Sequence, residues 1–402
     1  MDFINEAFMA LPPHRPTWAE INLDHLLFNL EGIRRAAGPD TKIMGVVKAD
    51  AYGHGFDVAE VLQDEGVDYL AVAFLDEGIA LRQKGIDRCG IFILGTTEIE
   101  QIPELVEWDI TPAVYQMDFA RALSDYCLEN DEVHPVHIKL DTGMGRIGLR
   151  WDEAVPVILE MAKLPGIRLE GIFTHFATAD AADKTFTHEQ LGRFAQVVKA
   201  LSDQGVDIPL KHVENSASIV DFEKTVFNMV RPGIILYGHY PSEEVKKSRL
   251  ALKPVMAFKT RIVNIKTIHA GDSVSYGRKF IAQGDRVVAT LPVGYADGYT
   301  RMLSGRGTEV LVKGQRAPVI GNICMDQCMI DITDLKDIAL HDEVELFGEN
   351  LLAEELADRL GTIAYEILCM VNKRVPRVYN FMDEQHLEVE ILNDGFYENL
   401  NF

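Results

Sequence analysis

The stretch Val46-Val47-Lys48-Ala49-Asp50-Ala51-Tyr52-Gly53-His54-Gly55 leads from an apolar run into a turn broken by glycines. The run itself, Ile43-Met44-Gly45-Val46-Val47, is typical of a strand buried on both faces. Lys48 follows at the carboxyl end of that strand, where burial would lower the pKa of an amine and make it nucleophilic. Enzymes use such an amine to form a Schiff base with a carbonyl compound. On position alone, a surface lysine that follows a strand is the better interpretation, so the rest of the chain must decide.

Short apolar runs recur from residue 43 to residue 237, and helix-like stretches separate them. The runs are Ile43–Lys48, Tyr69–Ala73, Ile91–Leu94, Thr111–Val114, Val136–Asp141, Leu169–His175, His212–Ser216 and Met229–Tyr237. Such alternation requires parallel strands joined by crossover helices. Eight runs in this length predict a closed (β/α)₈ barrel of the TIM type. The competing open doubly wound sheet is disfavoured because no G-x-G-x-x-G follows any of the runs.

Polar side chains stand where several of these runs end. They are Lys48, Asp141, Arg146, His175, Asn215, Ser216 and Arg231. In a barrel of this kind, the residues that bind ligands and do chemistry lie at the carboxyl ends of the strands. One such residue would mean little, but a group of them on one rim predicts a binding or catalytic site.

Beyond residue 250 the pattern changes to strand-like runs without helices between them. The runs are Met256–Ile268, Arg286–Gly294, Glu309–Lys313, Ala317–Ile323, Cys328–Ile332 and Asp342–Phe347, with helical stretches after them at Leu352–Leu360 and Ile363–Met370. This predicts a mainly antiparallel β domain. We therefore expect a barrel in residues 1–245, a C-terminal β domain in 246–387 and a peripheral acidic tail in 388–402, with the charged segment Pro241–Arg249 as linker.

Composition narrows the classes of partner. The formal net charge of −23 argues against nucleic acid and against an anionic membrane surface, because both need basic patches. The five cysteines are sparse, and Cys324 and Cys328 lack the second ligand pair of a zinc site, so we expect no metal. The first residues lack the basic flank and apolar run of a signal peptide, and no run is long enough to span a membrane. We expect a cytoplasmic protein.

Several blocks spread along the chain carry a resemblance to a known family. They are Val47–Gly55, Lys139–Arg146, His175–Ala177, Asn215–Ala217, Arg231–Ile234, Ser275–Gly277, Gly294–Gly298 and Cys324–Gln327. In this order and at these separations, they make the chain resemble the pyridoxal-phosphate-dependent alanine racemases from about residue 17 to residue 379. Any one block would be weak, but the set is highly specific.

The resemblance implies interconversion of L-alanine and D-alanine, which supplies D-alanine for cell-wall peptidoglycan. Lys48 would hold pyridoxal phosphate in the resting enzyme and then act as the base on one face of the substrate. Tyr276 would be the base on the other face, from the β domain of the partner in a homodimer with shared active sites. A free tyrosine has a pKa near 10, so this role needs polar neighbours. By resemblance, they form a chain through His175, Arg231 and His212.

Arg231 would face the pyridine nitrogen of the cofactor. Because an arginine cannot accept a proton, it would leave that nitrogen unprotonated, which suits clean racemization. The resemblance implies further cofactor contacts from Tyr52, Arg146, His175, Asn215, Ser216, Gly233, Ile234 and Tyr365. It implies substrate contacts from Arg146, Tyr295 and Met325. Lys139 occupies the position that family members carry as a carbamate beside Arg146.

Some residues depart from the family pattern. Glu214 stands where a small residue is usual, Asn322 where a basic residue is common, and Asn372-Lys373 replaces a small or aromatic pair. None of these changes removes a catalytic group.

Two other functions remain open. A racemase of another small amino acid such as serine would share this scaffold, because a hydrophobic pocket rejects an added hydroxyl only weakly. A non-catalytic pyridoxal-phosphate-binding protein would resemble the barrel alone, and Tyr276, Tyr295 and Met325 on an added β domain argue against it. A related decarboxylase would carry a carboxylate where Arg231 stands.

Overall fold

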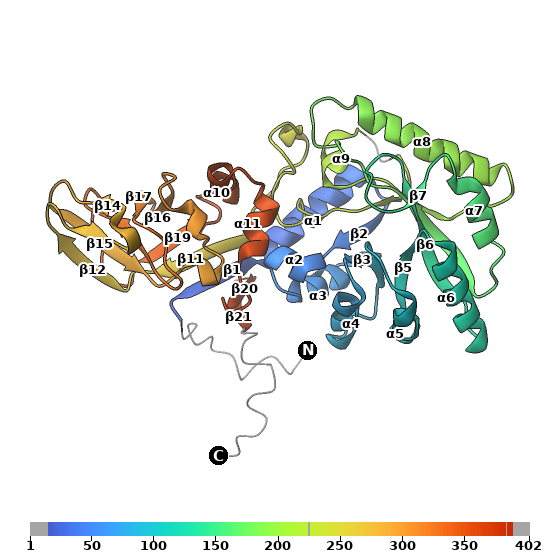
Figure 1. The fold of residues 1–402 in the computed structure, drawn as a ribbon, viewed down its shortest axis with the longest axis horizontal. Helices are drawn as coiled ribbons and strands as arrows, with labels where there is room; N and C mark the ends of the chain where they lie inside the picture. Colours follow the sequence, from blue (N-terminus) through green and yellow to red (C-terminus); the bar gives the residue numbers. More distant parts are fainter. Residues whose placement is uncertain (1–14, 224–225, 383, 389–402) are drawn as a thin grey trace, which may run out of the picture. The chain divides into compact units, whose positions relative to one another are not determined.

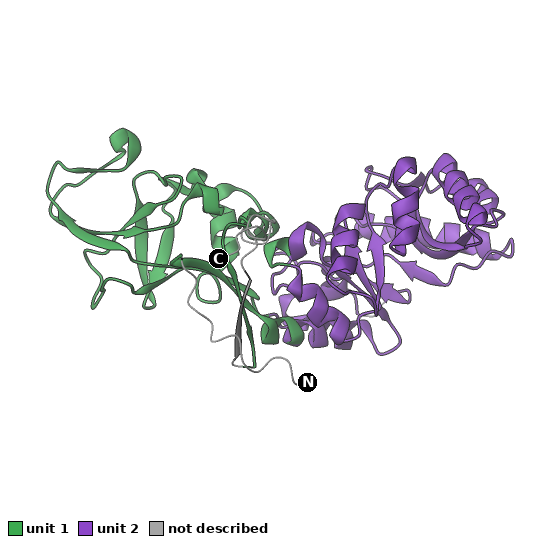
Figure 2. Cartoon of the chain, turned by 90° about the horizontal axis from the view of Figure 1, so that it is seen from below, with its two compact units in different colours: residues 1–27, 52–55, 253–402 green, residues 28–51, 56–252 purple. Residues whose placement is uncertain are grey.

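A computed structural model describes residues 15–223, 226–382 and 384–388 of the chain. The acidic tail expected at the C-terminus lies outside the described residues from 389 onward. The chain forms two compact units, shown in different colours in Figure 2. Unit 1 comprises Met1–Leu27, Tyr52–Gly55 and Lys253–Phe402, and unit 2 comprises Phe28–Ala51 and Phe56–Leu252.

Unit 2 is a nearly closed parallel barrel, which confirms the predicted fold class. Its strands pair in the order β10-β2-β3-β4-β5-β6-β8-β9. They are β2 (Lys42–Val46), β3 (Tyr69–Val72), β4 (Gly90–Ile93), β5 (Ile110–Val114), β6 (His134–Asp141), β8 (Ile167–Phe173), β9 (Leu210–His212) and β10 (Met229–Val230). A short extra strand, β7 (Leu149–Arg150), pairs with β6.

Helices between successive strands cover the outside of the barrel (Figure 1). They are α1 (Leu23–Ala37), α3 (Asp57–Asp64), α4 (Leu75–Gln83), η1 (Ile99–Gln101), α5 (Ile102–Glu107), α6 (Met117–Glu129), α7 (Ala154–Met161), α8 (Thr185–Ser202) and α9 (Ser216–Asp221). The short elements α2 (Lys48–Gly53) and η2 (Lys247–Arg249) complete the set. In α6 the buried residues Phe119, Leu123 and Cys127 recur every four positions, so one face of that helix packs inward.

Unit 1 is built on one sheet in the order β12-β15-β18-β17-β16-β19-β11-β1-β20-β21. Its strands are β1 (Thr17–Asn22), β11 (Met256–Arg261), β12 (Asn264–Ile268), β15 (Arg286–Leu291), β16 (Glu309–Val312), β17 (Gln315–Ile320), β18 (Cys328–Asp331), β19 (Glu343–Phe347), β20 (Arg377–Phe381) and β21 (Glu384–Glu388). Strands β13 (Ser273–Val274) and β14 (Phe280–Ile281) form a separate hairpin. The helices are η3 (Tyr276–Arg278), η4 (Tyr295–Asp297), η5 (Arg301–Leu303), α10 (Ala353–Leu360) and α11 (Ala364–Met370).

The pairing in unit 1 is antiparallel except between β1 and β20. This confirms the predicted mainly antiparallel domain. Its first strand comes from the N-terminus, where β1 lies between β11 and β20. Side chains also join β1 to β11, because the buried hydroxyl groups of Thr17 and Thr260 are hydrogen-bonded at 2.8 Å.

Some predicted strands are longer than the observed ones. The run Met256–Ile268 is two strands, because the chain bends between Arg261 and Asn264 to pair with different neighbours. The run ending at Ser216 stops being a strand at His212, since Asn215 and Ser216 already begin helix α9. Apolar content marks burial in such segments but does not mark where a strand ends.

Candidate functional site

The predicted barrel residues gather at the carboxyl ends of the strands of unit 2. Lys48 lies two residues beyond the end of β2, and His175 lies two residues beyond the end of β8. Asn215 caps the helix that follows β9, and Arg231 comes directly after β10. The structure therefore brings the rim that the sequence predicts to one end of the barrel.

The segment after Lys48 is a left-handed turn. Ala49, Asp50, Ala51 and Tyr52 have φ angles of 54°, 56°, 49° and 55°. Left-handed backbone costs an L-residue about 1–2 kcal/mol, so four in succession are held only by surrounding contacts. One contact is the Ala49 amide, which donates to Glu77 Oε1 at 2.6 Å. The turn sets the direction in which the chain leaves Lys48.

Gly53 ends this turn at φ 82°. A Cβ there would lie 2.5 Å from the backbone oxygen of Leu368, so only glycine fits. Arg377 donates to the Gly53 carbonyl from Nη2 at 2.8 Å, and the Tyr379 hydroxyl donates to the His54 carbonyl at 2.9 Å. Gly53 and His54 are thus fixed within unit 1.

Arg231 is almost fully buried, at 3% exposure, and its guanidinium is held by backbone carbonyls. Nη1 donates to the His212 carbonyl at 2.7 Å, and Nη2 donates to the Thr174 carbonyl at 2.8 Å. Nη1 also lies 3.1 Å from His212 Nδ1, and Nη2 lies 3.4 Å from His175 Nδ1. Among the hydrogen bonds that Arg231 forms with described residues, none uses its Nε–H. The guanidinium can therefore offer that edge to an acceptor such as a pyridine nitrogen.

The histidines beside Arg231 are neutral. Burial and the adjacent Arg231 charge hold the pKa of His175 and of His212 well below the ordinary value. Burial also lowers the pKa of Arg231, to about 10, which leaves the guanidinium charged at neutral pH. Arg231, which we expect beside the cofactor ring, is therefore a permanent cation next to the neutral imidazoles of His175 and His212.

Asn215 and Ser216 follow β9, and Gly233 follows β10, on two loops that a hydrogen bond joins. The Asn215 side chain accepts from the Ser218 amide at 3.2 Å, and the Ser218 hydroxyl accepts from the Asn215 amide at 2.9 Å. This capping box fixes the start of α9. The Ser216 hydroxyl accepts from the Gly233 amide at 2.9 Å, which joins two predicted phosphate-contacting residues across separate loops. Ile234 follows directly and is fully buried.

Lys139 is buried at 3% exposure within β6. Its Nζ donates to the Leu140 carbonyl at 3.0 Å and lies 4.9 Å from the centre of the Phe173 ring. Burial, with Arg231 and Arg146 nearby, lowers the pKa of Lys139 to about 7. A buried amine that shares its surroundings with two arginines therefore loses its proton near neutral pH.

Arg146 is exposed at the end of a loop that Asp141 shapes. The Asp141 carboxylate accepts from the amides of Gly143 at 2.9 Å and Gly145 at 3.1 Å. Asp141, which the sequence places on the catalytic rim, thus acts on the backbone of the loop that carries Arg146.

Tyr276, Tyr295 and Met325 lie on neighbouring loops of unit 1, and all three side chains are exposed, at 67%, 40% and 52%. The Tyr295 amide donates to the Cys324 carbonyl at 3.1 Å, next to Met325. The Asn322 side chain donates to the Tyr276 carbonyl at 2.7 Å, and the Ser275 hydroxyl donates to the Asn322 carbonyl at 2.5 Å. Large side chains that are exposed on loops fixed by hydrogen bonds indicate a surface that contacts another molecule.

Tyr52 and Tyr365 also belong to unit 1. Their ring centres are 5.9 Å apart with planes tilted by 48°. Burial raises the pKa of Tyr52, so its phenol stays protonated and able to donate a hydrogen bond.

Sequence reasoning missed two polar residues of the barrel interior, His137 and Glu170. His137 Nδ1 lies 2.9 Å from His212 Nε2, and His137 Nε2 lies 3.5 Å from Glu170 Oε2. The sequence did contain a pattern that places His137 in the barrel interior. His137, Lys139 and Asp141 alternate along one apolar strand, and residues at this spacing share one face.

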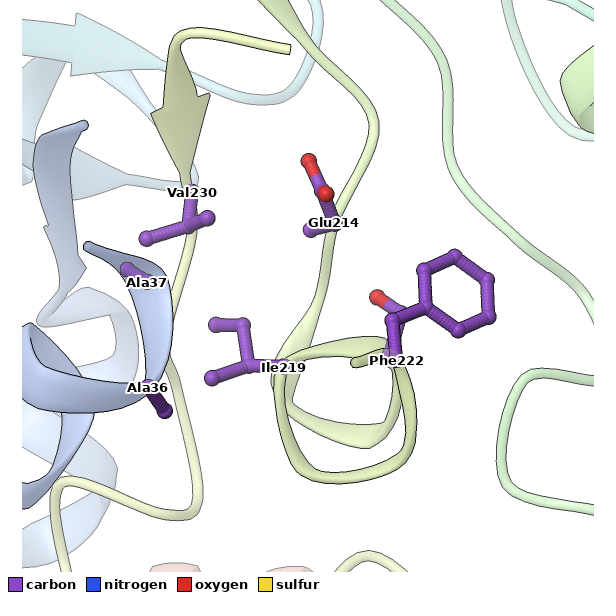
Figure 3. Close-up of a pocket in the computed structure, with 7 residues that line it drawn as sticks. Ala36, Ala37, Glu214, Ile219, Phe222 and Val230 are labelled. Carbon is purple, nitrogen blue, oxygen red and sulfur yellow. The ribbon is translucent and has the colours of Figure 1, made fainter. Parts of the chain in front are cut away.

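Glu214, which departs from the family pattern, lines a small hollow (Figure 3). The other lining residues are mainly apolar: Ala36, Ala37, Ser218, Ile219, Phe222 and Val230. Glu214 Oε1 accepts from the Val226 amide at 2.7 Å, while Oε2 has no hydrogen-bond partner among the described residues. Burial raises the pKa of Glu214 to about 7. Asn322 and Asn372 instead hold backbone turns of unit 1.

Two family models match the chain. Residues 21–241 match the N-terminal domain of alanine racemase, and residues 255–379 match its C-terminal domain. Together they cover both units.

Individual relatives agree with the family models. The alanine racemase of Clostridium tetani is 48% identical over 91% of this chain and 95% of its own length. The structure of alanine racemase from Clostridium difficile 630 matches with a TM-score of 0.89 and 47% identity, over 93% of this chain and 98% of that one. The Bacillus anthracis alanine racemase with bound L-Ala-P matches with a TM-score of 0.88 and 35% identity, over 95% of this chain and all of that one. In the described part of this chain, no helix has the length and apolar character that crossing a membrane requires.

Proposed function

The chain belongs to the alanine racemase family, and from that premise we propose how its residues divide the work. It interconverts L-alanine and D-alanine, and in this family D-alanine goes to cell-wall peptidoglycan. Members of the family depend on pyridoxal phosphate. The observation that carries our assignment is the buried Arg231, whose Nη atoms bind carbonyls and neutral histidines while its Nε–H faces no described acceptor.

We assign the cofactor to the barrel rim. Lys48 would bind it covalently, Arg231 would donate to the ring nitrogen, and Ser216 and Gly233 would contact the phosphate. Asn215, Ile234, Tyr52, Tyr365, His175 and Arg146 would complete the site. When bound, the cofactor makes the α-proton of the amino acid acidic. The donor set fits, since it offers an amine nucleophile and several N–H and O–H groups for anionic oxygens.

Racemization requires proton removal on one face of the α-carbon and proton delivery on the other. We assign one face to Lys48 and the opposite face to Tyr276, each acting as acid and base in turn. His175 would lie between Tyr276 and Arg231 in a hydrogen-bonded chain. Arg146 and the Met325 amide would hold the substrate carboxylate, and Tyr295 would border the substrate.

We propose a homodimer in which each site combines one barrel with the partner's β domain. The exposure of Tyr276, Tyr295 and Met325 supports this arrangement, because three large side chains on fixed loops form a contact surface. We place the reaction in the cytoplasm, as for the family.

The assay that tests this function follows the optical rotation of the purified holoenzyme with L-alanine and, separately, with L-serine. We expect the rotation of the alanine solution to fall to zero and that of serine to fall more slowly. A pocket distinguishes an added hydroxyl by only about 10²-fold. Faster loss with serine would make the chain a serine racemase on the same scaffold. No loss with either would contradict catalysis.

We propose further that Lys139 carries a carbamate. A neutral amine attacks CO₂, forms an N–C bond and releases one proton, and the resulting anion would compensate the charges of Arg146 and Arg231. Above pH 7, protein equilibrated with ¹³C-bicarbonate should show a carbamate carbon signal, since the pKa of Lys139 is about 7. As pH falls through that value, the protonated amine no longer reacts and the signal should disappear.

Lys139→Met should lack the signal at every pH. Lys163→Met is the matched control, because its side chain is 68% exposed and should not hold a carbamate. A signal that survives in Lys139→Met would place the modification elsewhere, and its absence from the wild-type protein would contradict the assignment.

A further inference from the structure

A line of polar side chains runs from Arg231 through the interior of the barrel to a carboxylate. Arg231 Nη1 lies 3.1 Å from His212 Nδ1, and His212 Nε2 lies 2.9 Å from His137 Nδ1. His137 Nε2 then faces Glu170 Oε2 at 3.5 Å. These residues come from β6, β8, β9 and the end of β10, so the line crosses several strands of unit 2.

The hydrogen-bonding capacities give this line a single direction. An arginine only donates, so His212 Nδ1 must be its unprotonated nitrogen. A neutral His212 therefore carries its proton on Nε2 and donates it to His137 Nδ1. By the same reasoning, His137 carries its proton on Nε2, which points at the Glu170 carboxylate. The line thus ends in an electrostatic contact: His137 Nε2 lies 3.5 Å from Glu170 Oε2 and forms no hydrogen bond with a described residue.

The surroundings fix both rings and the charge at the end of the line. His212 stacks on Phe173 with ring centres 4.9 Å apart, and His137 lies 4.7 Å from the centre of Phe92. A Cβ at position 171 would come within 2.4 Å of the His137 ring, so the ring occupies space that only glycine leaves. Both imidazoles are fully buried.

The acceptor at the end is a carboxylate at all physiological pH values. Tyr69 donates to Glu170 Oε2 at 2.6 Å, and Arg168 donates to Oε1 at 2.9 Å. The nearby His137 imidazole, together with these two hydrogen bonds, lowers the pKa of Glu170 to about 2, against the effect of burial. Burial lowers the pKa of His137, which keeps that imidazole neutral.

Building on the proposed function, we propose that Glu170 and His137 are positioning residues that orient Arg231 by fixing the tautomer of His212. With the opposite tautomer, His212 Nδ1–H would point at the Nη1–H of Arg231, donor against donor, and would push the guanidinium away. Glu170 makes that tautomer unfavourable because its negative charge, 3.5 Å from His137 Nε2, favours a proton on that nitrogen. Carboxylates beside metal-binding histidines fix the tautomer of the imidazole in the same way.

The test is the protonation of the two His212 nitrogens, measured by ¹⁵N NMR of the histidine-labelled holoenzyme and of the protein without cofactor. His212→Asn identifies its signals among those of the 12 histidines. In the wild-type protein we expect Nδ1 unprotonated and Nε2 protonated. A protonated Nδ1 on a neutral His212 would overturn the proposal, even if every variant failed to fold.

Glu170→Met removes the acceptor with little change in size. We expect a mixture of His212 tautomers and a loss in kcat/KM of roughly 10–100-fold, as for other residues that orient a functional histidine. Glu170→Gln keeps one oxygen and should restore much of the wild-type tautomer. Glu160→Met, at a carboxylate 59% exposed in an ion pair with Lys163, is the matched control and should leave the His212 signals unchanged.

Wild-type tautomer populations in Glu170→Met, or equal defects in the Met and Gln variants, would contradict the role of Glu170. A wild-type protein that shows the expected tautomers but does not racemize alanine would contradict the proposed function and leave this line of hydrogen bonds intact.

Discussion

Lys48→Ala should be colourless and almost inactive. In the proposed site, the visible absorbance of the holoenzyme would come from a Schiff base between Lys48 and the cofactor, and the same amine would serve as one of two bases. Loss of a positioned base alone costs about 10²–10⁴-fold in rate, and loss of covalent attachment adds to that. Absorbance spectra and racemization rates of the purified variant measure both effects.

Lys42→Ala is the matched control, because Lys42 begins β2, the strand that precedes Lys48, and pairs with Asp68 at 2.6 Å on the exposed side. It should remain yellow and active. Borohydride reduction and peptide mapping of the wild-type protein should place the cofactor on Lys48. Label on another lysine would overturn the assignment.

Arg231→Glu should change which reaction the enzyme performs. A carboxylic acid beside the ring nitrogen can share a proton with it, whereas an arginine cannot. The protonated ring withdraws electrons more strongly, so the deprotonated substrate lives longer. We expect racemization to fall by about 10²–10⁴-fold, a new long-wavelength absorbance band with alanine, and pyruvate as a transamination product.

Arg231→Lys is the control for this prediction, because it keeps a cation while it loses part of the hydrogen-bonding capacity. It should lose activity without the new band and without extra pyruvate. If Arg231→Glu and Arg231→Lys gave the same spectrum and product ratio, Arg231 would not contact the ring nitrogen.

The barrel could be predicted because parallel strands covered on both faces are continuous apolar runs, as in Ile91–Leu94 and Thr111–Val114. The pairing partners of a strand, by contrast, could not be predicted. The alternation of Thr17–Asn22 predicts a strand, yet its partners β11 and β20 lie more than 230 residues away in the chain. Local pattern carries no information about such pairing.

The candidate site, too, could be predicted only in part. Residue type and position at strand ends identify Lys48, His175 and Arg231, because a barrel rim concentrates polar groups. The left-handed turn of Ala49, Asp50 and Ala51 could not be predicted, since alanine disfavours positive φ and Asp50 tolerates it only as a single residue. The partners of Arg231 beyond His212 likewise depend on side-chain directions across the barrel, which a sequence pattern of single strands does not give.

The central claim is that each site takes one base from each of two chains, and mixing two inactive variants tests it most directly. Lys48→Ala and Tyr276→Phe are unfolded and refolded together in equal amounts. Random pairing makes about half of the dimers mixed, and each mixed dimer has one doubly altered and one intact site by two-fold symmetry. Activity should return to about a quarter of the wild-type value at equal total protein. A mixture with proven mixed dimers that stays as inactive as its parents would contradict the shared site.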